Sequence, residues 1–139
     1  MTKQTILLSV GLLTAFTFSA GADELKLGDA SKLPAPAGKA GVTWDADIKP
    51  IVEKSCGKCH GGEKPKGKFR ADTKANFLKG GESGEPVVVG KSDKSAVIHM
   101  VADLVADMEM PPTDKREKYP PLTKEQIGLL RAWIDQGAK

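Results

Sequence analysis

The chain of 139 residues is long enough for one folded domain, and its 21 basic residues nearly balance its 18 acidic residues. The resulting net charge of +3 is too small to favour nucleic acid as a partner. Aromatic residues make up only 5% of the chain, which is few for a protein of this size that builds its core from side chains alone. We therefore expect a single domain with no nucleic-acid partner.

The first 22 residues have the pattern of a secretory signal peptide. Lys3 supplies the positive charge, residues 6–18 form an apolar stretch, and residues 20–22 (Ala-Gly-Ala) provide a small-x-small cleavage site. The apolar stretch is shorter than the roughly 20 residues that span a bilayer. The alternative to a cleaved signal peptide is an uncleaved membrane anchor. We expect a periplasmic or otherwise exported protein that has no stable membrane span after cleavage.

Residues 23–41 are rich in Ala, Gly and Pro and have no sustained helical or strand period. This composition is typical of a flexible arm or tether. The sequence thus predicts a signal peptide over residues 1–22, a flexible arm over residues 23–41 and a folded domain over residues 42–139.

A short helix is predicted over residues 43–55, because Ile48, Ile51 and Val52 recur at the spacing of one helical face. An aspartate at position 45 or 47 could cap its N-terminus. Pro50 fits only within the first turn, where its missing N–H costs nothing.

The helix leads into Cys56-Gly57-Lys58-Cys59-His60, which contains both cysteines of the chain and one of its two histidines. A C-x-x-C-H run is the attachment signature of c-type haem. The two thiols can each add to a vinyl group of one porphyrin, and the histidine can become an axial ligand of the iron. A buried porphyrin would also supply the apolar bulk that the few aromatic residues do not.

Other readings of these residues are a disulfide oxidoreductase, a zinc site and a structural disulfide. The first needs an alternation of strands and helices that the chain lacks. A zinc site would need Cys56, Cys59, His60 and His99 together, with adjacent Cys59 and His60 on one metal, which is an awkward geometry. A disulfide between Cys56 and Cys59 would close a very small ring and stabilise little. Covalent haem is the favoured reading.

Further along, residues 61–68 read as a loop, residues 69–78 as a weak helical turn, residues 80–84 as a turn and residues 85–90 as a short extended piece. A second helix with one apolar stripe is predicted, with Ser92 as its N-cap and its end before Met108. A third is predicted from Thr123, where Thr123 and Gln126 form a capping box and Leu122 and Ile127 a hydrophobic staple. Its end is expected near Gly137.

Met110 is the favoured candidate for the sixth iron ligand. It lies between the second and third helices on a segment stiffened by Pro111 and Pro112. A thioether on a rigid segment can stay bound to the iron in both oxidation states. Met108, His99 or an open site are the alternatives, although His99 is expected to be a partly buried, hydrogen-bonded residue instead.

The chain resembles small monohaem cytochromes c of the planctomycete type. The resemblance runs from Trp44 to the C-terminus and is carried by these runs: 47–51, Cys56 with Cys59 and His60, 66–72, 79–84, 90–95, 110–112, 122–123 and 133–138. It implies an all-α, cytochrome-c-like fold whose N- and C-terminal helices cross around a covalently bound haem. It also implies thioether links at Cys56 and Cys59, with His60 and Met110 as axial ligands.

The sequence therefore predicts an exported electron carrier with one covalent haem c, and not an enzyme. Its partners would be redox proteins of unknown identity, and we expect a monomer. One alternative is a haem enzyme or gas-binding sensor with a labile sixth ligand. Another is a haem subunit tethered to a dehydrogenase.

Overall fold

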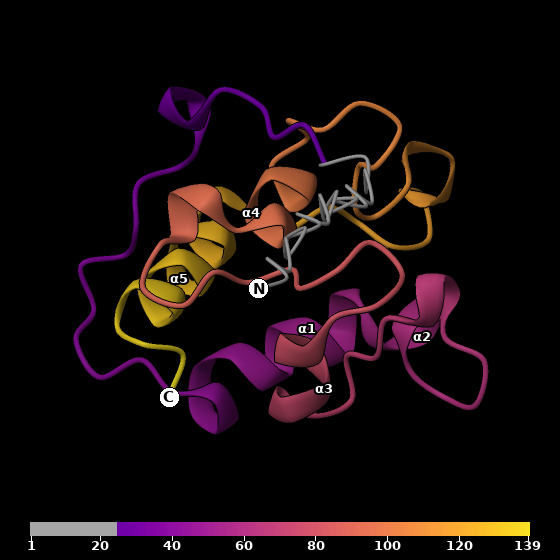
Figure 1. The fold of residues 1–139 in the computed structure, drawn as a ribbon, viewed down its shortest axis with the longest axis horizontal. Coiled ribbons are helices and arrows are strands. Elements are labelled where there is room, and N and C mark those ends of the chain that lie inside the picture. Colours follow the sequence, from indigo (N-terminus) through magenta and orange to yellow (C-terminus); the bar gives the residue numbers. More distant parts are fainter. Residues whose placement is uncertain (1–24) are drawn as a thin grey trace, which may run out of the picture.

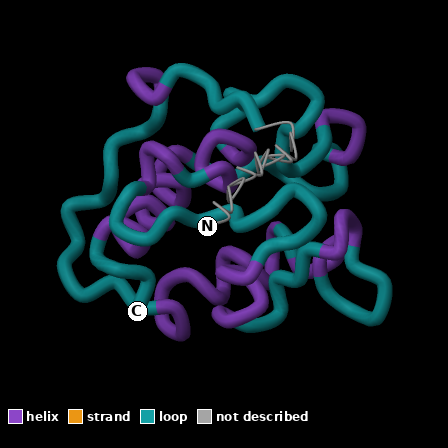
Figure 2. The backbone as a smooth tube through the Cα atoms, viewed as in Figure 1, coloured by secondary structure: helices purple, strands orange, loops and turns teal. Residues whose placement is uncertain are grey.

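The computed structural model describes residues 25–139, so the predicted signal peptide lies outside the described residues. The described chain is helical and contains no strand, only an isolated bridge between Gly81 and Gly84 (Figures 1 and 2). The α-helices are α1 (Lys49–Ser55), α2 (Gly57–His60), α3 (Lys74–Lys79), α4 (Ala96–Val101) and α5 (Lys124–Asp135). The π-helical turn η2 (Trp44–Ile48) precedes α1, and the 3-10 turns are η1 (Ala30–Lys32), η3 (Lys66–Lys68), η4 (Ser92–Lys94) and η5 (Thr113–Lys115). The secondary structure confirms the all-α class, and none of these helices has the length and apolarity to cross a bilayer.

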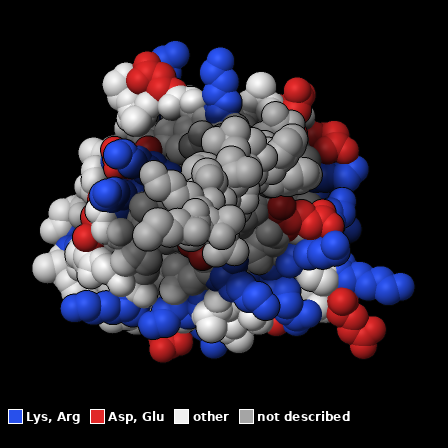
Figure 3. Space-filling model, viewed as in Figure 1, with Lys and Arg blue, Asp and Glu red and all other residues white. Residues whose placement is uncertain are grey.

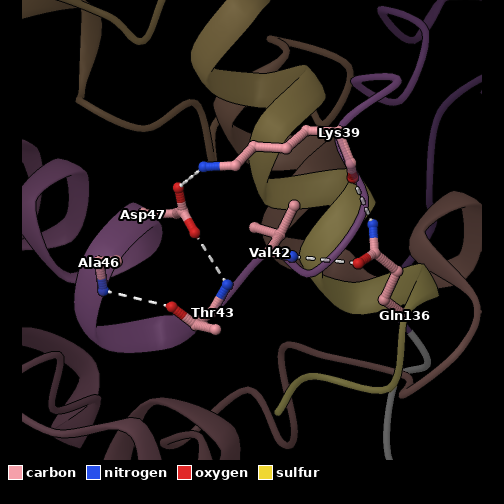
Figure 4. A network of polar contacts seen from close by, with 6 residues as sticks. All are labelled: Lys39, Val42, Thr43, Ala46, Asp47 and Gln136. Carbon is pink, nitrogen blue, oxygen red and sulfur yellow. Dashed lines mark hydrogen bonds and ion pairs between the residues drawn. The ribbon is translucent and has the colours of Figure 1, made fainter.

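The helical stretch before the cysteines begins as predicted but has a different cap. Thr43 caps η2, because its hydroxyl accepts a hydrogen bond from the Ala46 N–H at 3.4 Å. The Asp47 carboxylate instead accepts a hydrogen bond from the Thr43 N–H at 2.9 Å and forms an ion pair with Lys39 (Figure 4). Pro50 lies in the first turn of α1, where the sequence places it.

The core is centred on three aromatic rings from three parts of the chain. Trp44 of η2 lies 5.3 Å from Phe77 of α3 and 5.4 Å from Trp133 of α5, measured between ring centroids. Trp133 is completely buried, and Phe77 is 1% exposed. The N- and C-terminal helical segments are therefore in direct contact; their arrangement around a haem stays a prediction.

Helix α5 has the termini that the sequence predicts. Thr123 and Gln126 form the reciprocal capping box, and both staple residues, Leu122 and Ile127, are buried. Gly137 follows the helix with a φ of 96°, a conformation in which a Cβ would be strained. Six residues of α5 are buried, so this helix anchors the core.

The second predicted helix is shorter than expected. Ser92 does not cap it; its N–H and hydroxyl bind the Asp135 carboxylate at 2.8 and 2.9 Å, and extended backbone at Ser95 separates η4 from α4. Helix α4 then ends at Val101, because positive φ angles at Asp103 and Asp107 turn the chain. Residues 102–110, which we call the methionine segment, are therefore not helical.

Residues 25–41, the described part of the predicted arm, run beside α5 (Figure 1). Leu33 is 8% exposed and belongs to the core. The Ala37 N–H donates to the carbonyl of Gly128 at 2.8 Å, and Arg131 donates to the carbonyl of Pro34. The packed part of the chain thus begins before Val42, earlier than the sequence predicts, because backbone groups rather than a periodic apolar pattern hold the arm. Its flexibility stays a prediction.

Candidate functional site

One cavity collects the chemically distinctive side chains of the chain. It has a volume of about 200 Å³, and Cys56, Cys59, His60 and Met110 all line it. Its apolar wall comes from several elements and includes Phe69, Phe77, Val97, Val101 and Leu122. Residues that the sequence separates by fifty positions therefore share one apolar space.

Local helix geometry places the two cysteines and the histidine together. Helix α1 ends at Ser55, and the Cys56 N–H still donates to the Val52 carbonyl at 2.8 Å. The next turn continues as α2, in which the His60 N–H donates to the Cys56 carbonyl at 2.9 Å. Side chains at positions i, i+3 and i+4 lie on one side of a helical turn. Cys56, Cys59 and His60 therefore face the cavity as a group.

The ring of His60 is oriented by a backbone group. Its Nδ1 lies 3.1 Å from the carbonyl oxygen of Lys66, and Phe69 packs edge-on against the ring at 5.0 Å. A proton on Nδ1 that is donated to this carbonyl leaves Nε2 with a lone pair for a metal. Burial lowers the pKa of His60 below its usual value, and backbone hydrogen bonds to Lys66 and Phe69 oppose this shift. A neutral imidazole is the form that ligates a metal.

The cysteine thiols are free and half-buried. Burial, and secondarily the neighbouring Cys59, raises the pKa of the Cys56 thiol to about 11. Disulfide oxidoreductases need a lowered thiol pKa, so this environment disfavours thiolate chemistry. Residues 25–139 contain no group of three His, Cys, Asp or Glu residues that could hold a metal ion.

Three methionines line the cavity: Met100 from α4, and Met108 and Met110 from the methionine segment. The Met110 N–H donates to the Met100 carbonyl at 3.0 Å, which ties the end of the segment to α4. Met100 is not among the ligand candidates that the sequence suggests, although it lines the cavity. The signal was present, because Ala96, Val97, Met100 and Val101 have the spacing of one helical face.

His99 is not among the residues that line the cavity. It is 1% exposed, and its Nε2 lies 2.7 Å from the carbonyl oxygen of Asp93. Its Nδ1 has no hydrogen-bond partner among the described residues. The hydrogen-bonded role expected for His99 is thus what the structure shows, although its burial is more complete than the sequence suggests.

Polar residues also line the cavity, among them Lys58, Lys66, Glu82, Ser83 and Tyr119. Glu82 forms an ion pair with Lys68 at 3.0 Å. Figure 3 shows basic side chains over the lower part of the visible face, with acidic side chains among them. Tyr119, Glu82 and Ser83 were missed by sequence reasoning, because loops without a periodic pattern bring them to the cavity.

Residues 56–114 match the family described as Planctomycete cytochrome C. The match covers less than half of the chain and begins at the first cysteine of the C-x-x-C-H run. It includes His60, the methionine segment and Met110. No curated protein and no solved structure gave a match. The match confirms the resemblance over these residues and supports a c-type cytochrome, a class that carries haem c and transfers electrons.

Proposed function

We propose that the chain is an exported monohaem cytochrome c that carries one electron at a time. Cys56 and Cys59 would attach the haem, and His60 and Met110 would hold its iron. The observation that carries this proposal is the cavity that all four side chains line. The family match over residues 56–114 supports it independently of that geometry.

The residues present fit a covalently attached haem c. When bound, this cofactor supplies an iron that cycles between Fe(II) and Fe(III). The Lys66 carbonyl lies at hydrogen-bond distance from Nδ1 of His60, and a proton donated there would leave Nε2 to ligate the iron. Cys56 and Cys59 have the spacing of two thioether links, and the rings of Phe69 and Phe77 contribute to the apolar wall of the cavity.

Met110 would complete the coordination. Its thioether is a soft ligand that favours the reduced iron and so raises the reduction potential. Two features restrict the movement of Met110. Its N–H donates a hydrogen bond to the Met100 carbonyl, and two prolines follow it in the sequence. A permanently held sixth ligand denies small molecules a place on the metal, which favours a carrier over an enzyme or a gas sensor.

Covalent attachment is tested by the intact mass and absorption spectrum of chain exported from a host that matures c-type cytochromes. We expect the denatured chain to carry the mass of one haem, and we expect a variant with both Cys56→Ser and Cys59→Ser to carry none. A wild-type chain exported without covalent haem would refute the proposal.

The sixth ligand is tested by carbon monoxide binding to the reduced protein. We expect slow binding to the wild type and fast binding to Met110→Ala, because that change opens the metal. Met100→Ala and Met108→Ala are matched controls from the same cavity and should bind slowly. Fast binding by the wild type would favour the sensor or enzyme. If Met108→Ala is the only variant that binds fast, Met108 and not Met110 is the sixth ligand.

A further inference from the structure

The arm (residues 25–41) is fastened to α5 at successive points. As described above, the Ala37 N–H donates to the Gly128 carbonyl, and the Pro34 carbonyl accepts from the Arg131 guanidinium. Farther along, the Gln136 amide donates to the Lys39 carbonyl at 2.7 Å and accepts from the Val42 N–H at 3.1 Å (Figure 4). Arg131 also donates to the hydroxyl of buried Ser92 at 3.0 Å, so the same side chain joins the arm to η4.

Glycine makes the closest of these contacts possible. A Cβ on Gly128 would lie 2.7 Å from the carbonyl oxygen of Ala35, so only glycine lets the arm approach α5 this closely. This glycine occupies a helix interior, where alanine is about 1 kcal/mol more favourable. The glycine at this position is therefore explained by the close contact with the arm and not by helix formation.

The other end of the arm reaches the methionine segment (residues 102–110). A Cβ on Gly28 would lie 2.3 Å from the carbonyl oxygen of Leu104 and 2.7 Å from its Cβ. Residues 25–28 and residues 104–106 line a common hollow together with Met108. The arm therefore touches the segment that carries two of the three cavity methionines.

Other elements hold the methionine segment from its remaining sides. From α4, the carbonyls of His99 and Met100 accept hydrogen bonds from Leu104 and Met110 at 2.9 and 3.0 Å. From the C-terminal side, Arg116 binds the Asp103 carboxylate through both terminal nitrogens and the Pro111 carbonyl through Nε. Residues 105–109 lie between these attachments and have no regular secondary structure, and the arm packs directly before them at Leu104.

We propose that residues 25–37 act as a strap that joins α5 to the methionine segment and keeps Met110 at the cavity. Gly28 and Gly128 are the two close contacts of this strap. It is a positioning element, because it touches neither the haem-binding residues nor the cavity. The proposal rests on the proposed function, since it concerns the axial role of Met110.

The test uses the full chain with its haem and three alanine variants. Gly28→Ala and Gly128→Ala would push the arm from Leu104 and from Ala35. Gly38→Ala is the matched control in the same arm, because its added Cβ would meet nothing within 4 Å. Hydrogen exchange at the amides of the methionine segment and the rate of carbon monoxide binding to the reduced protein are measured for each.

We expect both clashing variants to raise the two rates by about tenfold, which corresponds to about 1.4 kcal/mol. Gly38→Ala should behave as the wild type, and the unfolding midpoint should show that all variants are folded. Unchanged exchange in Gly28→Ala would overturn the strap, and so would faster exchange without faster carbon monoxide binding. Met110→Ala is the reference for an open sixth site. If the wild type binds carbon monoxide as fast as this variant, Met110 does not ligate the iron and the proposed function is wrong on this point. Hydrogen exchange alone then tests whether the arm holds the methionine segment.

Discussion

Replacing Phe77 with alanine should remove a large part of the stability of the fold. Its side chain is 1% exposed, and its ring lies 5.3 Å from Trp44, 5.4 Å from Phe69 and 6.2 Å from Trp133. Buried Phe→Ala changes cost about 3–5 kcal/mol, and the loss of several ring contacts favours the upper part of this range. We expect a loss of about 4 kcal/mol, against a total of about 5–15 kcal/mol for an ordinary domain.

The assay is urea unfolding followed by far-ultraviolet circular dichroism. Phe77→Leu keeps most of the volume and should cost less than about 1.5 kcal/mol. Lys79→Ala, on the exposed side of the same helix, should change stability by no more than about 0.5 kcal/mol. If Phe77→Ala costs no more than Phe77→Leu, the aromatic cluster does not support the core as described. The result matters for the site, because Phe69 lies between Phe77 and His60.

Two further predictions concern polar contacts outside the cavity. Asp135→Ala should cost about 1–3 kcal/mol in urea unfolding, because it leaves the buried N–H of Ser92 without its acceptor; an unchanged midpoint would contradict this. Arg70→Gln should raise the pKa of Asp72 from about 2 toward its usual 3.8, since hydrogen bonds from Arg70 and then Asn76 lower it, and nuclear magnetic resonance titration of the carboxyl measures the shift. Because the folded-state pKa is depressed, the stabilising effect of this pair is present above about pH 4 and is lost as the pH falls toward 2. An Asp72 midpoint that does not move in Arg70→Gln would show that the pair is absent in solution.

Much of the candidate site was predictable because its chemistry is local. Cys56, Cys59 and His60 belong to one helical turn, so their spacing alone predicts that they face the same way. Pro111 and Pro112 predict a rigid segment that carries Met110, and the structure places Met110 at the same cavity. Met100 and Tyr119 were not selected, because their nearness to the cavity depends on how α4 and the following loops pack.

The sequence by itself determined the helical class, the motif and the capping of α5, since each depends on residues within a few positions of one another. Only the tertiary structure decided that α4 ends at Val101 and that Thr43 caps η2. It also decided the course of the arm, whose low-complexity composition predicts a tether. The physical reason is that hydrogen bonds to backbone carbonyls hold the arm. In addition, Gly28 and Gly128 have no side chain that would prevent the close contacts. Such contacts leave no hydrophobic period in the sequence, and they form only once α5 and the methionine segment are in place.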